Sequence, residues 1–171
     1  MPENKLVPVP DGVSDEVASC VTLKGITAEY LLHRAYHLKK GDKVLYHAAA
    51  GALGQILCPW ANSIGAEIIG TVGSKEKEEI AKKNGCHHVI NYTDKNFVEE
   101  VEKIVGKNGI DVVYDGVGLK TFEGSIEVLK IRGMMVAFGN ASGYVDTIDV
   151  KKHINAKGLF FTRPSIAHYT I

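Results

Sequence analysis

The sequence predicts a doubly wound α/β fold of the Rossmann type, with a parallel sheet of about six strands and helices on both faces. Short apolar runs alternate with amphipathic ones from residue 43 onward, which is typical of βαβ units. A glycine-rich turn, residues 48–54, follows the first apolar run and precedes the first amphipathic one. Right-handed crossovers between such units lead to a doubly wound strand order.

The N-terminal 40 residues differ from the rest of the chain. Residues 1–13 hold three of the five prolines, so we expect an extended lead-in. Ser14 is suited to cap a helix because two acidic residues follow it, and residues 23–36 form a second helical stretch. Residues 41–171 are then the nucleotide-binding domain. Its strands are expected at residues 43–49, 67–72, 88–91, 111–117, 134–138 and 159–162, and its helices at about 52–64, 74–84, 97–105 and 121–129.

One helix breaks a local rule. Pro59 lies inside the helix expected at residues 52–64, where it removes a backbone hydrogen bond. We therefore expect a kink or a 3₁₀ segment between Gln55 and Pro59.

Composition excludes several classes of protein. Lys plus Arg and Asp plus Glu both number 20, so no basic excess supports nucleic-acid binding. No apolar run approaches the ~18–20 residues that a membrane span needs, and the first residues lack a signal-peptide pattern. A chain of 171 residues is long enough for one domain with a substantial core. We expect a cytoplasmic protein that binds neither nucleic acid nor a membrane.

The cysteines and histidines do not predict a metal site. Cys20, Cys58 and Cys86 are far apart in sequence, and none belongs to a Cys/His cluster with zinc-ligand spacing. His87 and His88 are adjacent on an expected strand, so their rings point to opposite faces of the sheet. We expect no bound metal.

The glycine-rich turn is the segment of the sequence that most specifically indicates a ligand. On the G-x-G-x-x-G template Gly51 and Gly54 occupy the second and third glycine positions, and Ala49 replaces the first. The second glycine lets the backbone approach a pyrophosphate, and the third lets the helix pack closely on the strand. The helix that begins near Ala52 and Leu53 offers free N–H groups to an anion. We expect the pyrophosphate of a nicotinamide dinucleotide here; a tight turn that binds nothing is the alternative.

The end of the second strand indicates NADP(H) rather than NAD(H). An NAD site usually has Asp or Glu about 20 residues beyond the motif, on the ribose hydroxyls. This strand ends instead at Gly73 and Ser74, without a carboxylate at its tip. Ser74 can donate a hydrogen bond and Lys77 can pair with a 2′-phosphate, provided that Glu76 faces outward. The alternative is that residues 75–77 are an ordinary solvated helix start.

Two other functions fit parts of the pattern. A module that binds or senses a dinucleotide without catalysing a reaction would have the same turn, and steady-state assays would distinguish it. An S-adenosylmethionine methyltransferase also has a glycine-rich first turn, but such folds usually place an acidic residue after the second strand. Residues 70–74 contain none, which disfavours that function.

Taken together, the motifs resemble the cofactor-binding domain of the zinc-free, zeta-crystallin-like quinone oxidoreductases of the medium-chain dehydrogenase/reductase superfamily. The resemblance extends almost from end to end. The segments that carry it are PDGVSDEVA, LKGITAEYLL, HAAAGALG, GAEIIGTVGS, VINY, DVVYDGVG, MMVAFGNASG and TRPS.

The resemblance implies further cofactor contacts. Lys77 and Tyr92 would bind the 2′-phosphate, and Thr27 would lie near the nicotinamide or the phosphates. The F-G-N segment would lie beside the nicotinamide, and the D-G-V segment would line the cleft. Tyr92 as a loop aromatic and Thr27 as a helix-surface residue are the plain alternatives. The expected cofactor-binding residues are Thr27, Ala49, Gly51, Ala52, Leu53, Gly54, Gly73, Ser74, Lys77, Tyr92, Asp115, Val117, Phe138, Gly139 and Asn140.

The resemblance also implies a reaction and a domain context. Relatives pass reducing equivalents from NADPH to a quinone or a similar electrophilic alkene or carbonyl compound, and no residue here is nominated as an acid–base catalyst. Relatives have a GroES-like catalytic domain before the matching region, so residues 1–40 would lie at a domain junction, and a C-terminal return segment after it. The chain would then be an excised cofactor domain or a split gene product, weakly active or inactive alone. Relatives dimerise through this domain, so we expect a homodimer through the sheet edge near Leu159 and Thr162.

Overall fold

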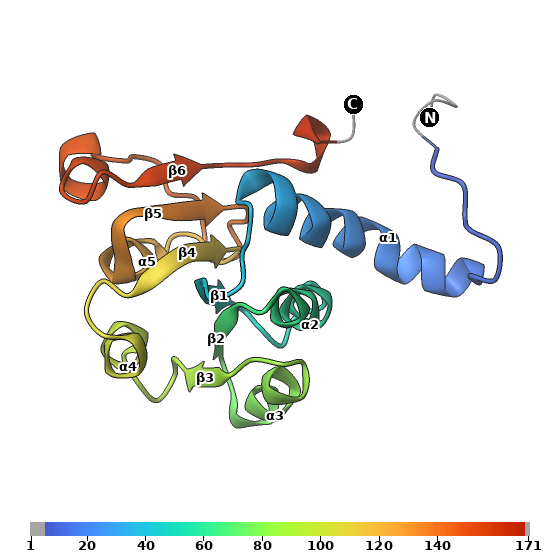
Figure 1. The fold of residues 1–171 in the computed structure, drawn as a ribbon, viewed down its shortest axis with the longest axis horizontal. Coiled ribbons are helices and arrows are strands. Elements are labelled where there is room, and N and C mark those ends of the chain that lie inside the picture. Colours follow the sequence, from blue (N-terminus) through green and yellow to red (C-terminus); the bar gives the residue numbers. More distant parts are fainter. Residues whose placement is uncertain (1–5, 170–171) are drawn as a thin grey trace.

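Six parallel strands form one sheet in the computed structural model, which describes residues 6–169 (Figure 1). The strand order is β3-β2-β1-β4-β5-β6, so the chain builds outward from β1 on one side and then from β4 on the other. The predicted fold class is confirmed. The strands are β1 Lys43–His47, β2 Glu67–Val72, β3 His88–Asn91, β4 Ile110–Asp115, β5 Leu129–Ala137 and β6 Phe160–Thr162, and the helices are α1 Asp15–Tyr30, α2 Gly54–Ile64, α3 Lys75–Lys83, α4 Phe97–Val105 and α5 Phe122–Val128.

The helices cover both faces of the sheet and give it two separate cores (Figure 1). Successive residues of a strand point to opposite faces. Val44 of β1 therefore packs in the core beneath α1, α2 and α3, whereas the next residue, Leu45, packs in the core beneath α4 and α5. Strands buried on both faces have continuous apolar sequences, as the apolar runs predict.

The predicted element boundaries are largely confirmed. β2, β3 and α4 have the expected bounds, and Ser14 and Ser74 cap α1 and α3 through their side chains. β5 begins earlier than expected, at Leu129, which still pairs with Ile110. A bulge then interrupts the pairing, and regular register resumes at Met134, where the strand was expected to begin.

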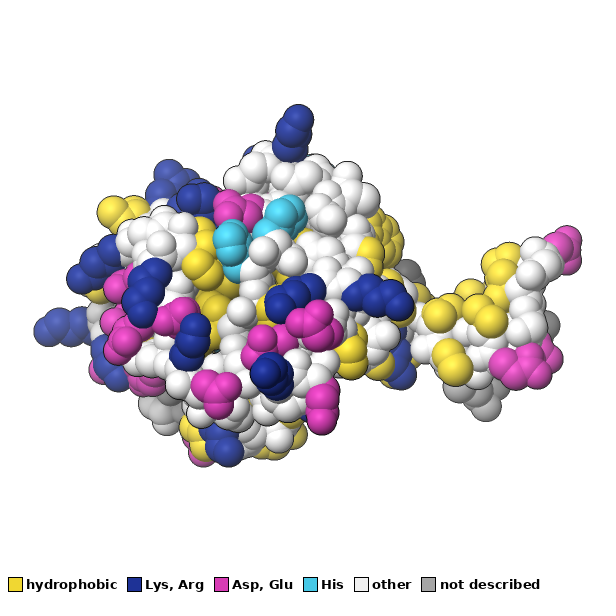
Figure 2. Space-filling model, turned by 90° about the horizontal axis from the view of Figure 1, so that it is seen from below, with side chains coloured by type: hydrophobic (Ala, Val, Ile, Leu, Met, Phe, Trp, Pro, Cys, Tyr) yellow, Lys and Arg dark blue, Asp and Glu magenta, His cyan; other side chains and the backbone are white. Residues whose placement is uncertain are grey.

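The N-terminal region forms one helix and not two. α1 continues without interruption to Tyr30 and then into a π-helical turn, Leu31–Ala35. The expected separation is wrong because residues 15–23 contain neither glycine nor proline, so nothing in this stretch breaks the helix. The first half of α1 stands away from the body of the molecule with apolar side chains exposed (Figures 1 and 2).

For the next helix we expected a kink or a 3₁₀ segment between Gln55 and Pro59; no 3₁₀ segment forms, and the kink remains a prediction. α2 is assigned as α-helix from end to end, with Pro59 inside it. A single hydrogen bond of the 3₁₀ type, from Ile56 N to Leu53 O at 3.0 Å, occurs in its first turn. Pro59 and Gln55, whose carbonyl loses a partner, lie on the exposed side of the helix, where water can satisfy that carbonyl.

Candidate functional site

The glycine-rich turn lies at the carboxyl end of β1. At this strand the order in which strands are added reverses, because β2 lies on one side of β1 and β4 on the other. Ala48 has a positive φ of 62°, and Ala49 N donates to Thr71 O at 3.0 Å, which fixes the turn against β2. No side chain caps α2, and within residues 6–169 no acceptor bonds the N–H groups of Ala52, Leu53 and Gly54. Free N–H groups at a helix N-terminus favour an anion, and the binding of a pyrophosphate to them remains a prediction.

Gly54 holds α2 close to the turn. A Cβ at this position would lie 2.2 Å from the backbone oxygen of Ala49, so no larger residue fits without displacing the helix. The close-packing role predicted for this glycine is therefore confirmed. A Cβ on Gly51 would lie 3.1 Å from Ala48 O, so its expected role, the approach of a pyrophosphate, remains a prediction.

A cavity of about 110 Å³ at the end of β2 brings four of the expected residues together. Lys77 and Tyr92 line it together with Gly51 and Gly73. The Tyr92 hydroxyl lies over Gly73, where a Cβ would come within 2.6 Å of it. Glu76 does not line the cavity and is exposed. The lysine is therefore the charged group that faces this space.

Ser74 has a structural task beside this cavity. Its hydroxyl accepts a hydrogen bond from Lys77 N at 3.4 Å as the N-cap of α3. The hydroxyl proton remains available for a ligand, and the capped helix start points toward the same strand end.

A larger cavity of about 710 Å³ adjoins the first, and Ala48 and Tyr92 line both. Val117, which was expected to line the cleft, is one of its walls. Most of its lining was not predicted. The unpredicted residues are Lys95, Asn96, Phe97, Lys120, Thr121, Ala141 and Ser142.

Thr27 and Phe138 meet at a third cavity of about 560 Å³, which residues 163–166 also line. The Thr27 hydroxyl donates to Leu23 O at 2.7 Å, so toward a ligand it can only accept. A contact of Thr27 with the cofactor and a plain helix-surface role both remain predictions. Arg163 lines this cavity too, and its guanidinium donates to Pro164 O at 3.3 Å.

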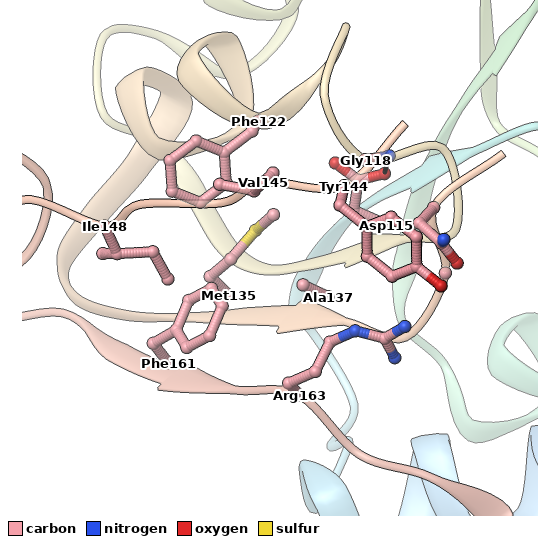
Figure 3. Close-up of a pocket in the computed structure, with 12 residues that line it drawn as sticks. Asp115, Gly118, Phe122, Met135, Ala137, Tyr144, Val145, Ile148, Phe161 and Arg163 are labelled. Atoms are coloured by element: carbon pink, nitrogen blue, oxygen red, sulfur yellow. Dashed lines mark hydrogen bonds between the residues drawn. The ribbon is translucent and has the colours of Figure 1, made fainter. Parts of the chain in front are cut away.

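Gly139 and Asn140 line a fourth cavity of about 380 Å³ on the other side of Arg163 (Figure 3). Figure 3 shows Phe122, Met135 and Phe161 at its apolar end, with Arg163 reaching toward Tyr144 at the opposite end. The four cavities lie along the carboxyl ends of the strands, where open α/β sheets bind ligands.

Asp115 holds the loop after β4 through hydrogen bonds within the protein, and its expected contact with the cofactor remains a prediction. Its buried carboxylate accepts hydrogen bonds from Val117 N at 2.7 Å and Gly118 N at 2.9 Å, and from the Thr121 hydroxyl at 2.7 Å. Phe138 N also donates to its backbone oxygen at 2.9 Å. Asp115 therefore shapes the loop after β4 and also lines the 380 Å³ cavity (Figure 3), whereas Val117 lines the 710 Å³ cavity.

The sequence reasoning missed a buried polar chain behind the site. His47, Thr71 and Ser125 are buried and hydrogen-bonded to one another, and Ser125 reaches Asp115. The signal that could have found them is local. His47 and Thr71 are polar residues near the ends of otherwise apolar strands, and buried polar groups need partners.

The histidine pair does not converge. His87 Nδ1 accepts from Ile68 N at 3.0 Å, whereas His88 Nε2 lies 3.3 Å from a carboxylate oxygen of Glu67. Within residues 6–169 no group of three or more His, Cys, Asp or Glu side chains could hold a metal ion. In the same range no helix is both long enough and apolar enough to cross a bilayer.

Comparison with known proteins identifies the family. Residues 52–171 match the model of the zinc-binding dehydrogenase family. The chain is 48% identical to the 2-haloacrylate reductase of Burkholderia sp, over 98% of this chain and 51% of that protein. It is 44% identical to quinone oxidoreductase 1 of Escherichia coli strain K12, over 97% of this chain and 51% of that protein.

Solved structures agree with the fold. The Escherichia coli quinone oxidoreductase complexed with NADPH matches with a TM-score of 0.92 at 43% identity, over 97% of this chain and 51% of that one. A Pseudomonas syringae quinone oxidoreductase matches with a TM-score of 0.94 at 40% identity, over 99% of this chain and 52% of that one. The chain spans about half the length of these relatives. It belongs to the zinc-binding dehydrogenase family, with quinone oxidoreductases among its homologues.

Proposed function

We propose that this chain is the NADP(H)-binding domain of a reductase. The observation that carries the proposal is the cavity at the end of β2, where Lys77 and Tyr92 face Gly51 and Gly73 and no carboxylate is present. A lysine is suited to a phosphate as a point charge, and a carboxylate at this position would repel it. A homologous structure is an NADPH complex, which supports the same cofactor.

The residues present fit a dinucleotide that crosses the carboxyl ends of the strands. The free N–H groups of Ala52, Leu53 and Gly54 would hold the pyrophosphate, and Lys77 and Tyr92 the 2′-phosphate. The larger cavity beside Val117 would hold the adenosine half, and the cavity between Thr27 and Phe138 the nicotinamide half. Asn140 would complete the nicotinamide end. These residues bind and orient, and the hydride chemistry is that of the cofactor.

Titration tests the proposal. Purified chain is titrated with NADPH and with NADH, and binding is followed by cofactor fluorescence. We expect Lys77→Ala to weaken NADPH binding roughly tenfold and to leave NADH binding unchanged, because a charged hydrogen bond is worth about 1.5–3 kcal/mol. Lys75→Ala is the matched control, since Lys75 is in the same helical turn and does not line the cavity. Equal losses in the two variants, or equal affinity of wild type for both cofactors, would contradict the proposal.

We further propose a quinone or another electrophilic alkene or carbonyl compound as the electron acceptor. The support is homology to quinone oxidoreductases and to a 2-haloacrylate reductase. Cofactor oxidation is measured with the chain and a soluble quinone. We expect binding of NADPH with slow turnover by these 171 residues, because they match only about half the length of the quinone oxidoreductases. Turnover as fast as that of a full-length quinone oxidoreductase would show this expectation to be wrong.

We also propose that the protein is zinc-free, cytoplasmic and a homodimer. Three free cysteines, Cys20, Cys58 and Cys86, suit a reducing compartment, and no metal-ligand cluster occurs in residues 6–169.

The dimer is proposed from the edge of the sheet. β6 lies at this edge with Phe160 53% exposed, and an apolar edge favours pairing with a second copy. Sedimentation at micromolar concentration tests the dimer, and a monomeric mass would count against it.

A further inference from the structure

A buried chain of hydrogen bonds runs behind the glycine-rich turn and crosses the sheet. It begins at Thr71 of β2, passes through His47 of β1 and reaches Ser125 of α5. His47 Nδ1 lies 2.9 Å from the Thr71 hydroxyl oxygen, and His47 Nε2 lies 3.0 Å from the Ser125 hydroxyl oxygen. Ser125 continues the chain to Asp115, 3.3 Å away. All four side chains are buried.

The acceptors around Ser125 determine the protonation of His47. The Ser125 hydroxyl has one proton, and it donates toward Thr121 O at 2.8 Å and Asp115 Oδ2, which can only accept. Nε2 of His47 must therefore carry the proton that Ser125 accepts. In the neutral imidazole Nδ1 then has the lone pair, and it accepts from Thr71. The arrangement selects the tautomer of the neutral imidazole that has its proton on Nε2.

Burial acts in the same direction as this arrangement. Burial lowers the pKa of His47, and the negative charge of Asp115 only partly opposes the effect. The groups that face the imidazole are the hydroxyls of Thr71 and Ser125, the ring of Phe97 on α4 at 5.1 Å between centroids, and Asp115 of β4. Asp115 is the titratable group among them. A second proton on the imidazole would turn Nδ1 from an acceptor into a donor, so the Thr71 hydroxyl would have to turn round and accept, and it would place a positive charge in this buried site.

The hydrogen-bonded chain is linked to two residues that line the 710 Å³ cavity. His47 directly precedes Ala48, and Asp115 fixes Val117 through its N–H. Ala48 and Val117 both line this cavity. A change at His47 can therefore reach Ala48 through the backbone and Val117 through Ser125 and Asp115.

We propose that neutral His47 is a positioning residue for nucleotide binding, which sets the glycine-rich turn relative to the loop after β4, and that its protonation weakens binding. The inference rests on the proposed NADP(H)-binding function. His47 does not line any of the four cavities, so it acts through the turn and through Ser125 and not by contact with the nucleotide.

The test measures NADP⁺ affinity of the chain by calorimetry between about pH 8 and about pH 5. NADP⁺ is used because it survives in acid, and its 2′-phosphate itself titrates near pH 6, so variants are compared at each pH. His47→Gln keeps an amide donor and acceptor but cannot take up a proton. His47→Leu removes both bonds. His88→Gln is the control, since His88 is half-exposed on β3 and faces Glu67.

At neutral pH we expect His47→Leu to weaken binding roughly tenfold and His47→Gln to stay within about threefold of wild type. On acidification wild type and His88→Gln should lose more affinity than His47→Gln. If His47→Leu does not fold, Ser125→Ala replaces it and is expected to weaken binding by a similar factor. By linkage, NADP⁺ should also lower the NMR-observed pKa of His47.

The outcomes separate the inference from the proposed function. Two results would overturn the role of His47 but leave the cofactor assignment standing. In the first, wild type and His47→Gln lose the same NADP⁺ affinity on acidification. In the second, wild type binds NADP⁺ no more tightly than His47→Leu and Ser125→Ala. Wild type that binds no NADP⁺ at any pH overturns the cofactor assignment and this inference together.

Discussion

Replacing Gly54 with alanine tests how tightly α2 is held against the nucleotide-binding turn. The added Cβ would lie 2.2 Å from Ala49 O and 2.7 Å from Ala49 C, roughly 1 Å inside ordinary contact. The obstructing atoms are backbone, so the helix or the turn must move. Overpacking costs about 1–3 kcal/mol, and the better helix propensity of alanine offsets up to about 1 kcal/mol. We expect a net loss near 2 kcal/mol, which lowers Tm by roughly 4–8 °C at this chain length.

Gly25→Ala is the matched control. Gly25 lies inside α1, and a Cβ there would meet nothing within 4 Å. The same substitution should therefore stabilise the protein by about 0.4–1 kcal/mol and raise Tm by roughly 1–4 °C. Thermal unfolding of both variants is followed by circular dichroism. If Gly54→Ala leaves Tm unchanged or raises it as Gly25→Ala does, the close packing of α2 on Ala49 is not what that glycine provides.

Three further predictions concern the same end of the sheet. Burial lowers the pKa of His47 in the folded protein. Below the ordinary histidine pKa the unfolded chain therefore binds more protons than the folded one. The free energy of unfolding is unaffected by His47 above that pKa and decreases as the pH falls below it. His47→Gln should reduce this acid sensitivity in urea titrations, and an identical pH dependence would contradict the assignment. Gly73→Ala should push the Tyr92 hydroxyl aside and weaken NADPH binding severalfold, as measured by fluorescence; unchanged affinity would exclude Tyr92 from the site. Asp111→Ala removes the acceptor of Lys43 N, 2.7 Å away at the start of β1, and should cost about 1–3 kcal/mol in urea unfolding, whereas a loss below about 0.5 kcal/mol would mean that water replaces the carboxylate.

Local patterns determine the parts of the fold that could be predicted. β2 and β3 are short segments built around apolar pairs, Ile68 with Ile69 and Val89 with Ile90, and α4 combines an apolar stripe with a capping asparagine, Asn96, so their bounds follow from the sequence. The parts that could not be predicted depend on distant residues. The irregular start of β5 is supported by a bond from Arg132 N to Lys157 O, and a π-helical turn, Val150–Asn155, is joined to α5 by the contact of His153 with Glu123.

Part of the candidate site could likewise be predicted from the sequence, and part could not. Lys77, Tyr92 and Gly73 follow the ends of two neighbouring parallel strands, so their convergence follows once the strand order is known. His47 and Ser125 are different, because their contact joins β1 to α5 across β4. Nothing in the sequence near either residue indicates the other, and only the three-dimensional packing reveals the pair.

α1 is one continuous helix, but only its second half packs against the hydrophobic core. Val17 and Val21 in its first half are 51% and 42% exposed, whereas Ala28 and Tyr30 near its end are buried in the core. A helical segment without tertiary packing is marginal in water, and its amide protons exchange through local fraying. The amides near Tyr30 exchange only when the core beneath them opens. Hydrogen exchange along this one helix should therefore change from fast to slow between Val21 and Ala28, and it would place the edge of the cooperative folding unit inside a helix and not at its end.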